Sequence, residues 1–300
     1  MGARNRVFLY NRETGLIEQE QIYEKWFMDW FYGTGPGRLI TRFLLSKKGF
    51  SRGYAWFKKR PGSKGQIIPF VEKYNIDISE LEEPLERFRD FNHFFTRRLK
   101  PGARPIEMSH DILISPADGR MMTLYIDTEL IVPIKGLSFT LGDLLGGVHK
   151  VDEWMGGTCV KVRLAPFDYH RFCYIDNGYH GPVVHVDGHL HSISPLALQH
   201  RLKILHGNLR DIVVLETENF GKVAHIDIGA ITVGRIHQHY CQGTNFRKGQ
   251  EKGYFEFGGS TIVLLFGPGR IRIDEDILHY SRKGIESLVR YGGPVGRRIK

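Results

Sequence analysis

The stretch Glu256 to Phe266 places a hydroxyl side chain where the backbone can bend sharply. Gly258 and Gly259 permit the bend, because glycine has no Cβ that would clash. The run Ile262 to Phe266 is apolar and rich in β-branched residues, which predicts a buried strand. Ser260 stands between them, and a serine hydroxyl that attacks the preceding carbonyl replaces an amide with an ester. Taken alone, the stretch is more simply explained as a glycine-rich loop that enters a core strand.

Three other side chains have types suited to acid–base or nucleophilic chemistry. Asp118 lies in the turn Ser115 to Gly119, where an aspartate is also common for structural reasons. His170 and Cys173 lie together in one short stretch. A histidine titrates near neutrality and passes a proton either way, whereas a thiol titrates higher and is a poor hydrogen-bond donor. A free cysteine is most often a small buried hydrophobe, so Cys173 by itself indicates no chemistry.

Four stretches resemble motifs of the phosphatidylserine decarboxylase family, the pyruvoyl-dependent enzymes of prokaryotic type. In chain order they are Phe91 to Arg97, Ser115 to Gly119, Leu164 to Phe172, and Glu251 to Thr261. One short motif matches by chance easily, whereas four in the family's order form a specific signal.

The resemblance implies that the chain cleaves itself between Gly259 and Ser260. Ser260 would become a pyruvoyl group, the covalent cofactor of the family, so no external cofactor is expected. Such a group supplies an electron sink for decarboxylation of an amino acid, as pyridoxal phosphate does. The products, residues 1–259 and 260–300, would stay together as a heterodimer, and the resemblance further suggests a homodimer.

The resemblance also implies a role for each titratable side chain. Asp118 matches the acidic member of the family's Asp-His-Ser processing triad. His170 matches the histidine that acts on the substrate during decarboxylation, where it would protonate the product carbon. Cys173 stands where the family usually has a second histidine, the base for self-cleavage, and a thiol would be a different base.

Three interpretations of this departure stay open at the level of sequence. Cys173 itself, or His170 in a changed role, supports slow cleavage. Alternatively, another histidine of the β-rich part enters the site, the candidates being His189, His191, His225, His237 and His239. In the third interpretation the protein is a poor or blocked processor.

Composition limits the class of protein. A chain of 300 residues that is 41% hydrophobic and 25% charged is typical of a globular protein with a large core. The first residues have no apolar region of a signal peptide, and no apolar stretch is long enough to span a bilayer. Cys159, Cys173 and Cys241 form no disulfide framework and no zinc-binding pair, so we expect a reducing compartment and no metal.

Positive charge is concentrated near the start of the chain. Residues 1 to 73 hold 14 Lys or Arg against 6 Asp or Glu, so nearly all of the net charge of +9 lies there. Amphipathic helices are predicted over about residues 18–32, 38–48 and 50–60, with aromatic faces edged by cations. Such faces suit a membrane interface better than nucleic acid, for which no recognition motif is present. The predicted membrane-docking side chains are Trp26, Phe27, Trp30, Phe31, Trp56 and Phe57.

The rest of the chain predicts an α+β fold, a mostly antiparallel β body with an N-terminal amphipathic helical appendage. Residues 74–100 read as helical, with an aromatic core stripe (Phe88, Phe91, Phe94, Phe95, Leu99), and residues 248–253 read as an exposed loop. Strands are expected over residues 121–126, 157–164, 181–186, 210–216, 223–229 and 262–266 without βαβ alternation. The domain prediction is a membrane-docking region over 1–75 and a decarboxylase body over 76–300.

Three functions compete at this stage. The first is a peripheral membrane enzyme, at the cytoplasmic face of the cell membrane, that converts phosphatidylserine to phosphatidylethanolamine and CO2. The second is a related decarboxylase of a soluble amino acid, which the basic aromatic N-terminus disfavours. The third is an unprocessed lipid-binding proenzyme, stalled because Cys173 replaces the processing histidine.

Overall fold

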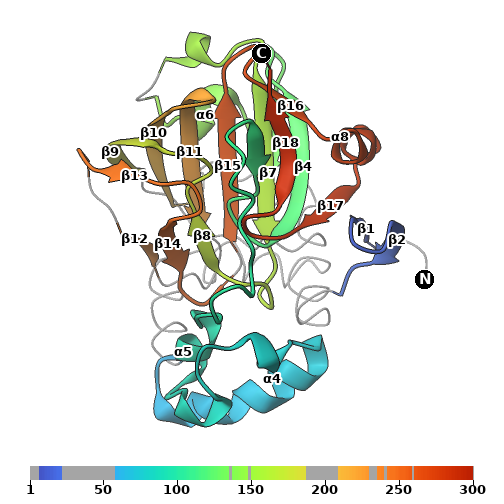
Figure 1. Cartoon of the computed structure of the whole chain (residues 1–300), viewed down its shortest axis with the longest axis vertical. Coiled ribbons are helices and arrows are strands. Elements are labelled where there is room, and N and C mark those ends of the chain that lie inside the picture. The colour runs from blue at the N-terminus through green and yellow to red at the C-terminus, as the bar shows by residue number, and fades with distance from the viewer. Residues whose placement is uncertain are drawn as a thin grey trace, which may run out of the picture.

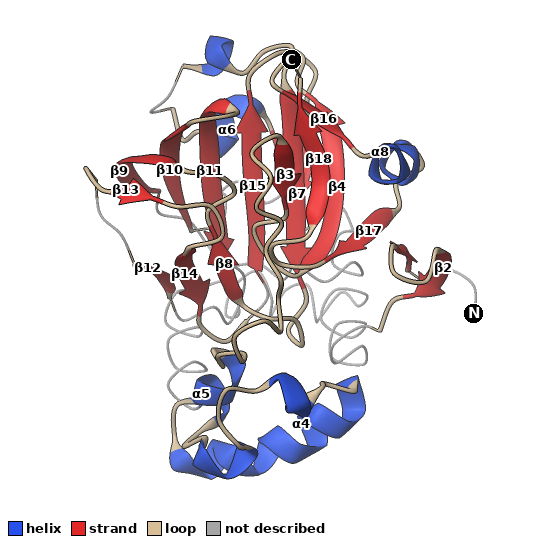
Figure 2. Ribbon diagram, in the orientation of Figure 1, coloured by secondary structure: helices blue, strands red, loops and turns tan. Residues whose placement is uncertain are grey.

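The computed structural model describes residues 7–21, 58–134, 137–147, 150–186, 209–229, 235–239, 242–258 and 260–299. Within these residues the main element is a ten-stranded sheet, which fills the upper part of the molecule in Figures 1 and 2. In spatial order its strands are β13 (Asn245–Phe246), β9 (Gly178–Val186), β10 (Arg210–Thr217), β11 (Gly221–Gly229), β15 (Ser260–Phe266), β7 (Thr158–Leu164), β4 (Gly119–Tyr125), β17 (Glu286–Val289), β1 (Phe8–Asn11) and β2 (Leu16–Gln19).

Neighbouring strands of this sheet run antiparallel, except β1 and β17, which are parallel. Three smaller sheets accompany it. They are β12 (Ile236–Gln238) with β14 (Glu251–Phe255) and β8 (Arg171–Cys173), then β16 (Ile271–Ile273) with β18 (Pro294–Arg298) and β3 (Ile112–Ile114), and β5 (Val132–Ile134) with β6 (Leu137–Phe139). The predicted α+β class with a mostly antiparallel body is therefore confirmed, and each predicted strand is present to within three residues at either end.

The central strand β15 is buried along its whole length because both faces of the sheet are covered. Side chains alternate between the faces. Ile262 and Leu264 face one apolar cluster, and Val263 and Leu265 face the other. Each such buried side chain contributes roughly 1.5–3 kcal/mol of hydrophobic stabilisation. This double burial is the reason for the unbroken apolar run in the sequence, and it makes the start of β15 a rigid place for a functional side chain.

A helical end lies beyond the sheet, at the bottom of Figure 1, and contains α4 (Ile67–Tyr74) and α5 (Phe91–Phe95). The prediction of one helical stretch over 74–100 is wrong. Asn75 ends α4 in the left-handed conformation, with φ of 52°, and Pro84 follows soon after. Three short helical pieces occupy the rest, namely η3 (Ile78–Glu80), η4 (Leu85–Arg87) and α5.

The predicted aromatic stripe is nevertheless core. Phe88, Phe91, Phe94 and Phe95 are buried in one cluster. The same cluster contains Phe257, which belongs to the glycine-rich stretch far along the sequence. The helical end therefore packs directly on the segment that precedes Ser260.

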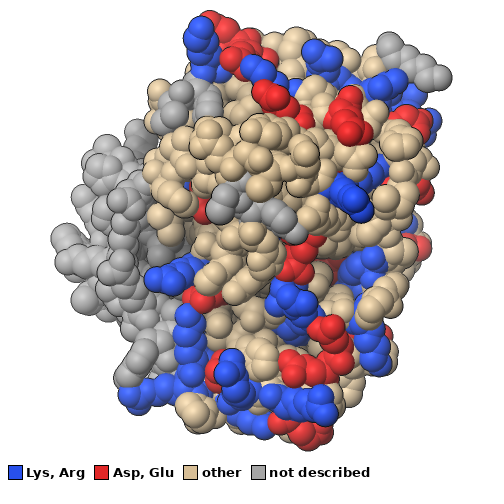
Figure 3. Space-filling view, turned by 60° about the vertical axis from the view of Figure 1, so that its left-hand side comes forward, with Lys and Arg blue, Asp and Glu red and all other residues tan. Residues whose placement is uncertain are grey.

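Further helical elements are η2 (Pro61–Gln66), α6 (Leu141–Leu144), η5 (Val151–Glu153) and α8 (Glu275–Arg282). α8 packs against β4 and β17, at the right of Figure 2. Lys and Arg side chains are prominent along the lower edge of the molecule in Figure 3, interspersed with acidic ones.

The predicted docking side chains Trp26, Phe27, Trp30, Phe31, Trp56 and Phe57 all lie outside the described residues, as do most of the three predicted N-terminal helices. Glu18 and Gln19 belong to β2, so a helix does not begin at residue 18. In the part of the chain that the structure describes, no helix combines the length and the apolar character needed to cross a membrane.

The prediction of an exposed loop over residues 248–253 is also wrong. Strand β14 begins at Glu251 and pairs with both β8 and β12. Lys252 is completely buried, and its ammonium group donates to Asp227 and Gln238 at 2.8 Å each. Two glycines and three charged residues in six positions are typical of an exposed loop. The structure instead buries the Lys252 ammonium group, because Asp227 on β11 provides a carboxylate partner.

Candidate active site

Ser260 is the first residue of β15 and is held from both sides. It pairs with Gly229 on β11 and with Leu164 on β7, and it is completely buried. Gly258, two residues earlier, has a φ of 139°, which only glycine adopts without strain. The predicted bend before the serine is therefore present at Gly258.

The loop that follows β7 brings His170 back over Ser260. The loop reverses at Ala165, whose N–H donates to the Asp168 carboxylate at 2.6 Å and whose carbonyl accepts from the Asp168 N–H at 3.0 Å. Because Leu164 is the pairing partner of Ser260, a tight reversal here places His170 beside that serine. The Ser260 hydroxyl oxygen lies 3.4 Å from Nδ1 of His170.

The hydrogen bonds of His170 define its tautomer. Its Nε2 lies 3.0 Å from the carbonyl oxygen of Ala165, which can only accept. Nε2 therefore carries the proton, and in the neutral ring Nδ1 is left to accept from the Ser260 hydroxyl. This is the arrangement in which a histidine acts as a general base on a serine.

Burial keeps this imidazole neutral. His170 is completely buried, and the ring of Phe95 stacks on it with centroids 4.0 Å apart. Desolvation, followed by the positive charge of Arg97, lowers the pKa of His170 to about 3. The ring is thus free to accept a proton throughout the physiological pH range, although it is a weak base in the uncleaved chain.

This lowered pKa predicts acid instability. The pKa of His170 falls from 6.5 to about 3 on folding, so its neutral form stabilises the fold above pH 6.5 and that contribution is lost as the pH falls towards 3. We expect the free energy of unfolding to decline by up to about 1.4 kcal/mol per pH unit in this window. The measurement is the free energy of unfolding against pH, by chemical denaturation, for the Ser260→Ala variant and for the double variant Ser260→Ala with His170→Asn. Both proteins lack Ser260, so both stay uncleaved. Burial also lowers the pKa values of His180 and His225, but their slopes cancel in the difference, and equal slopes in both proteins would contradict the assignment.

The segment before Ser260 is clamped by the helical end of the molecule. The backbone N–H of Phe257 donates to the side-chain oxygen of Asn92 at 3.0 Å. The carboxylate of Glu256 accepts from Lys59 at 2.8 Å and lies 2.9 Å from Nε2 of His237. Lys58 lies over the Phe257 ring at 5.0 Å. The residues that lead to the predicted cleavage point are therefore fixed in place rather than mobile.

Asp118 is held in its turn by a different set of groups. Its carboxylate accepts from Nε and Nη2 of Arg104 at 2.8–3.0 Å and from the backbone N–H of Tyr291 at 2.7 Å. Gly119 completes the turn, since a Cβ there would lie 2.7 Å from the carbonyl oxygen of Arg163. Among the described residues, no hydrogen bond joins Asp118 to His170 or Ser260.

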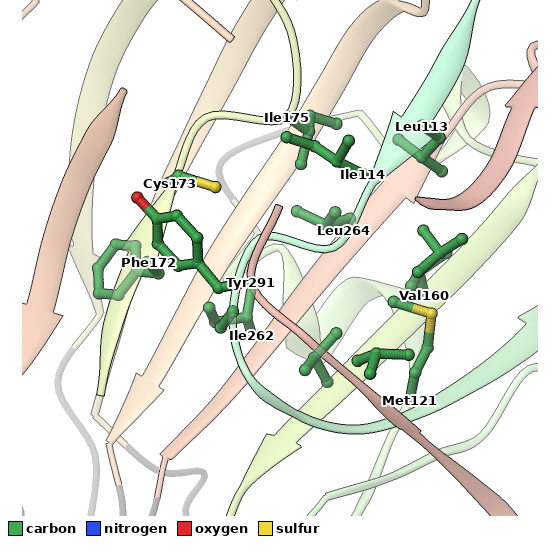
Figure 4. Packing of buried hydrophobic residues seen from close by; sticks show 14 of the residues in the cluster. Leu113, Ile114, Met121, Val160, Phe172, Cys173, Ile175, Ile262, Leu264 and Tyr291 are labelled. Atoms are coloured by element: carbon green, nitrogen blue, oxygen red, sulfur yellow. The ribbon is translucent and has the colours of Figure 1, made fainter. Parts of the chain in front are cut away.

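Cys173 packs behind that turn and not against Ser260. Its N–H donates to the carbonyl of Pro116 at 2.9 Å, and its Sγ lies 3.9 Å from the carbonyl oxygen of Ser115. Figure 4 shows the sulfur beside Tyr291 and among aliphatic side chains of the core. Burial raises the pKa of this thiol to about 12. Cys173 is therefore a neutral buried thiol that cannot act as a base near neutral pH.

The other histidines considered from sequence do not reach Ser260 where they are described. His225 pairs with Leu264, four residues along the strand from Ser260, which corresponds to about 13 Å. His237 and His239 contact the carboxylates of Glu256 and Glu251. His189 and His191 lie outside the described residues. Within the described part of the chain, no cluster of His, Cys, Asp or Glu has the arrangement of a metal site.

Sequence reasoning missed two polar residues of the first motif. The sequence pattern does not single out Asn92 or Arg97, because the phenylalanines between and beside them explain the motif as core packing. Their side-chain types could have indicated them, because an amide and a guanidinium within a buried aromatic stripe need hydrogen-bond partners there.

The fold and the site define an α+β protein with a buried serine–histidine pair at the first residue of a central strand. A family model described as phosphatidylserine decarboxylase matches residues 91–296. The chain is 41% identical to the phosphatidylserine decarboxylase proenzyme of Clostridium beijerinckii, covering 98% of this chain and 99% of that one. It is 42% identical to the proenzyme of Chlamydia muridarum (98% and 99%) and 38% identical to that of Clostridium perfringens strain SM101 (97% and 100%). The chain belongs to the phosphatidylserine decarboxylase family.

Proposed function

We propose that this protein is a pyruvoyl-dependent decarboxylase that converts phosphatidylserine to phosphatidylethanolamine and CO2. The observation that carries the proposal is the Ser260 hydroxyl, 3.4 Å from the neutral nitrogen of His170, at the point where the family motif ends. Family membership and relatives matched over nearly their whole length support it. The proposed location is the cytoplasmic face of the cell membrane, where the basic N-terminal region would dock on lipid.

The first step would be self-cleavage. His170 takes the hydroxyl proton, and the Ser260 oxygen attacks the carbonyl carbon of Gly259 so that an ester replaces the peptide bond. Elimination across Cα–Cβ of Ser260 then releases the Gly259 carboxylate and leaves dehydroalanine, which water converts to a pyruvoyl group and ammonia. The clamp on Glu256 and Phe257 supports this step, because holding the reacting atoms in place lowers the entropic part of the barrier.

The site is compatible with a pyruvoyl group at position 260. The group has fewer atoms than serine, so it fits the same buried position at the start of β15, and Leu164 and Gly229 would continue to hold the strand. When present, the group supplies the electron sink for loss of CO2. His170 would then return a proton to the substrate carbon, while Phe95 and Phe257 exclude water from the site.

The two chains produced by cleavage would remain one molecule. β15 lies between β11 and β7 in the middle of the sheet, so residues 260–300 would stay paired with the longer chain on both sides. A homodimer, which the family resemblance suggests, is part of the proposal as well.

The test is the intact mass of the purified, denatured protein together with CO2 release from phosphatidylserine vesicles. We expect two chains, one ending at Gly259 and one beginning with pyruvoyl, and we expect Ser260→Ala to give one full-length chain without activity. A control variant is Ser287→Ala, which removes another completely buried serine hydroxyl on a strand of the same sheet. Cleavage at another bond, or activity in Ser260→Ala, would contradict the proposal.

One observation favours a second function, that of a stalled lipid-binding proenzyme. The thiol at position 173 is neutral and buried, so this chain has one base fewer than the family motif provides. A single full-length species that binds phosphatidylserine vesicles but releases no CO2 would support this alternative.

A further inference from the structure

Glu20 is a buried carboxylate at the end of the N-terminal hairpin, which is formed by β1 and β2. It directly follows β2, and only 4% of the residue is exposed. Its backbone N–H donates to the carbonyl oxygen of Val7 at 2.8 Å, so the hairpin fixes its position. A buried carboxylate loses its hydration and is stable only where cations or donors replace the water. Glu20 therefore depends on partners in the body of the protein.

Two arginines of the large sheet are these partners. Nε of Arg120, on β4, lies 2.8 Å from one carboxylate oxygen of Glu20. Nη2 of Arg163, on β7, donates to both carboxylate oxygens at 2.8 and 3.0 Å. The two arginines stand opposite each other in the pairing of β4 with β7. Glu20 thus joins the N-terminal hairpin to two central strands, of which β7 pairs with β15 at Ser260.

The charges around Glu20 are balanced. The cluster contains three carboxylates and three cations, namely Glu20, Asp168 and Glu286 with Arg120, Lys161 and Arg163. All six side chains are at most 13% exposed. Glu20 is the member that the N-terminal hairpin contributes, and its removal leaves a surplus positive charge in a buried place, which is unfavourable.

Arg120 connects this cluster to the loop that carries His170. Its Nη1 pairs with the carboxylate of Asp168, and its guanidinium lies over the ring of Phe167, 5.0 Å from the ring centre. The same oxygen of Asp168 accepts from the N–H of Ala165 at 2.6 Å, which closes the reversal after β7. The carbonyl oxygen of Ala165 in turn lies 3.0 Å from Nε2 of His170. The orientation of the imidazole therefore depends on where Arg120 holds Asp168.

Arg120 meets its two carboxylates with different nitrogens. Nε lies beside Glu20 and Nη1 beside Asp168, so a carboxylate at each of these nitrogens limits rotation of the guanidinium. Without Glu20 the guanidinium is free to turn two nitrogens towards Asp168, because arginine and carboxylate prefer such a bidentate pair. That turn moves the carboxylate of Asp168 away from the N–H of Ala165.

We propose that Glu20 is a positioning residue for His170, acting through Arg120 and Asp168. Glu20 keeps the guanidinium in the orientation that leaves Asp168 on the Ala165 N–H, and so keeps the Ala165 carbonyl on Nε2 of His170. The inference rests on the proposed function, because the step that it serves is self-cleavage at Ser260. It gives the N-terminal hairpin, which precedes the predicted docking region in sequence, a part in preparing the active site.

The experiment follows self-cleavage by the intact mass of the chain after synthesis in a cell-free system. We expect Glu20→Gln to slow cleavage by about 10- to 100-fold, because a displacement of about 1 Å at the reacting groups has an effect of this size. The matched control is Glu286→Gln, which removes a buried carboxylate that contacts Arg163 and Lys161. Both variants leave the same surplus charge in the cluster, and we expect the control to cleave within about threefold of the wild-type rate.

A second readout does not depend on cleavage and does not follow from a mere loss of stability. In the uncleaved Ser260→Ala variant, the imidazole ¹⁵N chemical shifts of His170 report which nitrogen carries the proton. The signals of His170 are those that disappear when His170→Asn is added. We expect the proton on Nε2 in Ser260→Ala, alone or with Glu286→Gln, and a mixture of both tautomers when Glu20→Gln is added.

A double variant tests the route through Asp168. If Glu20 acts through this carboxylate, Glu20→Gln should change the cleavage rate by less than about threefold once Asp168→Asn is present, because the two residues then share one effect. Losses of rate that multiply in the double variant would show that Glu20 does not act through Asp168.

Several outcomes would overturn the assignment. Cleavage of Glu20→Gln within threefold of the wild-type rate is one, and equal slowing in Glu286→Gln is another, since it assigns the effect to charge and not to position. If Glu20→Gln does not fold, as judged by its melting temperature, Arg120→Lys decides the outcome. Lysine keeps the charge but not the planar group that reaches both carboxylates, so slower cleavage supports the proposal and a wild-type rate contradicts it.

The same experiments separate this inference from the proposed function. Wild-type protein that cleaves, with unchanged cleavage and an unchanged His170 tautomer in the Glu20→Gln variants, sinks the inference and keeps the function. Wild-type protein that does not cleave sinks the proposed function, whereas the tautomer of His170 still tests the role of Glu20.

Discussion

Replacing His170 with asparagine should slow self-cleavage by about 10²- to 10⁴-fold, the usual contribution of a positioned general base. His170 is the side chain that the structure places against the Ser260 hydroxyl, at 3.4 Å, with its unprotonated nitrogen directed at it. Asparagine keeps a polar side chain of similar reach but has no nitrogen that can take a proton. A mere loss of packing would lower stability without this selective effect on rate.

The measurement is a time course of intact mass after synthesis of the chain in a cell-free system. The matched control is His237→Gln, which alters a histidine that contacts the same segment through Glu256. We expect that control to cleave within about threefold of the wild-type rate, because His237 does not reach the serine. Cleavage of His170→Asn at the wild-type rate would contradict the assignment of His170 as the base.

The sequence predicted strand β15 well because a single physical cause acts on it. Both faces of β15 are buried, so every position from Ile262 to Phe266 must be apolar, and the pattern is visible in one line of sequence. The bend before Ser260 could also be predicted from the sequence, because the φ of Gly258 is one that glycine alone adopts without strain. The strands predicted elsewhere in the body followed from the same rule of apolar runs between glycine and proline.

The prediction of one helical stretch over residues 74–100 is wrong because the spacing of apolar residues alone does not reveal where a helix stops. Asn75 ends α4, and Asp90 caps α5 by accepting from the N–H of His93 at 2.8 Å. The aromatic residues still meet in one cluster, because their partner is Phe257 and not the next turn of a helix. Tertiary packing across about 160 residues cannot be inferred from a local period.

The pairing of charges was the least predictable part of the site. Lys252 lies in the segment predicted to be an exposed loop, but it forms a buried ion pair with Asp227 at 2.8 Å. Lys59, at the end of the third predicted amphipathic helix, holds Glu256. Each partner lies on an element distant in sequence, so composition gave no hint of it. The resemblance to the family pointed to Asp118 and His170, but it did not predict the contact between His170 and Ser260, which only the three-dimensional structure shows.

Introducing histidine at position 173, as Cys173→His, should accelerate self-cleavage by about tenfold or more, because it adds a second imidazole base at a position where the thiol, with its pKa raised to about 12, provides none. The position is suited to this role. It adjoins the turn of Asp118 through the hydrogen bond to Pro116 and the contact with Ser115, so a longer side chain there extends the set of titratable groups beside this turn. The larger ring must also fit a fully buried space, and overpacking typically costs about 1–3 kcal/mol, so a lower melting temperature should accompany the faster cleavage.

Two companion variants decide which residue acts. Cys173→Ser should cleave within about threefold of wild type, because removing a neutral thiol removes no base, and Cys159→Ser is the control for loss of a buried thiol on β7. The double variant His170→Asn with Cys173→His should recover much of the cleavage that His170→Asn loses, since the new imidazole would serve the serine in its place. A double variant as slow as His170→Asn alone would show that position 173 does not reach Ser260, and that in this chain His170 performs the processing step by itself.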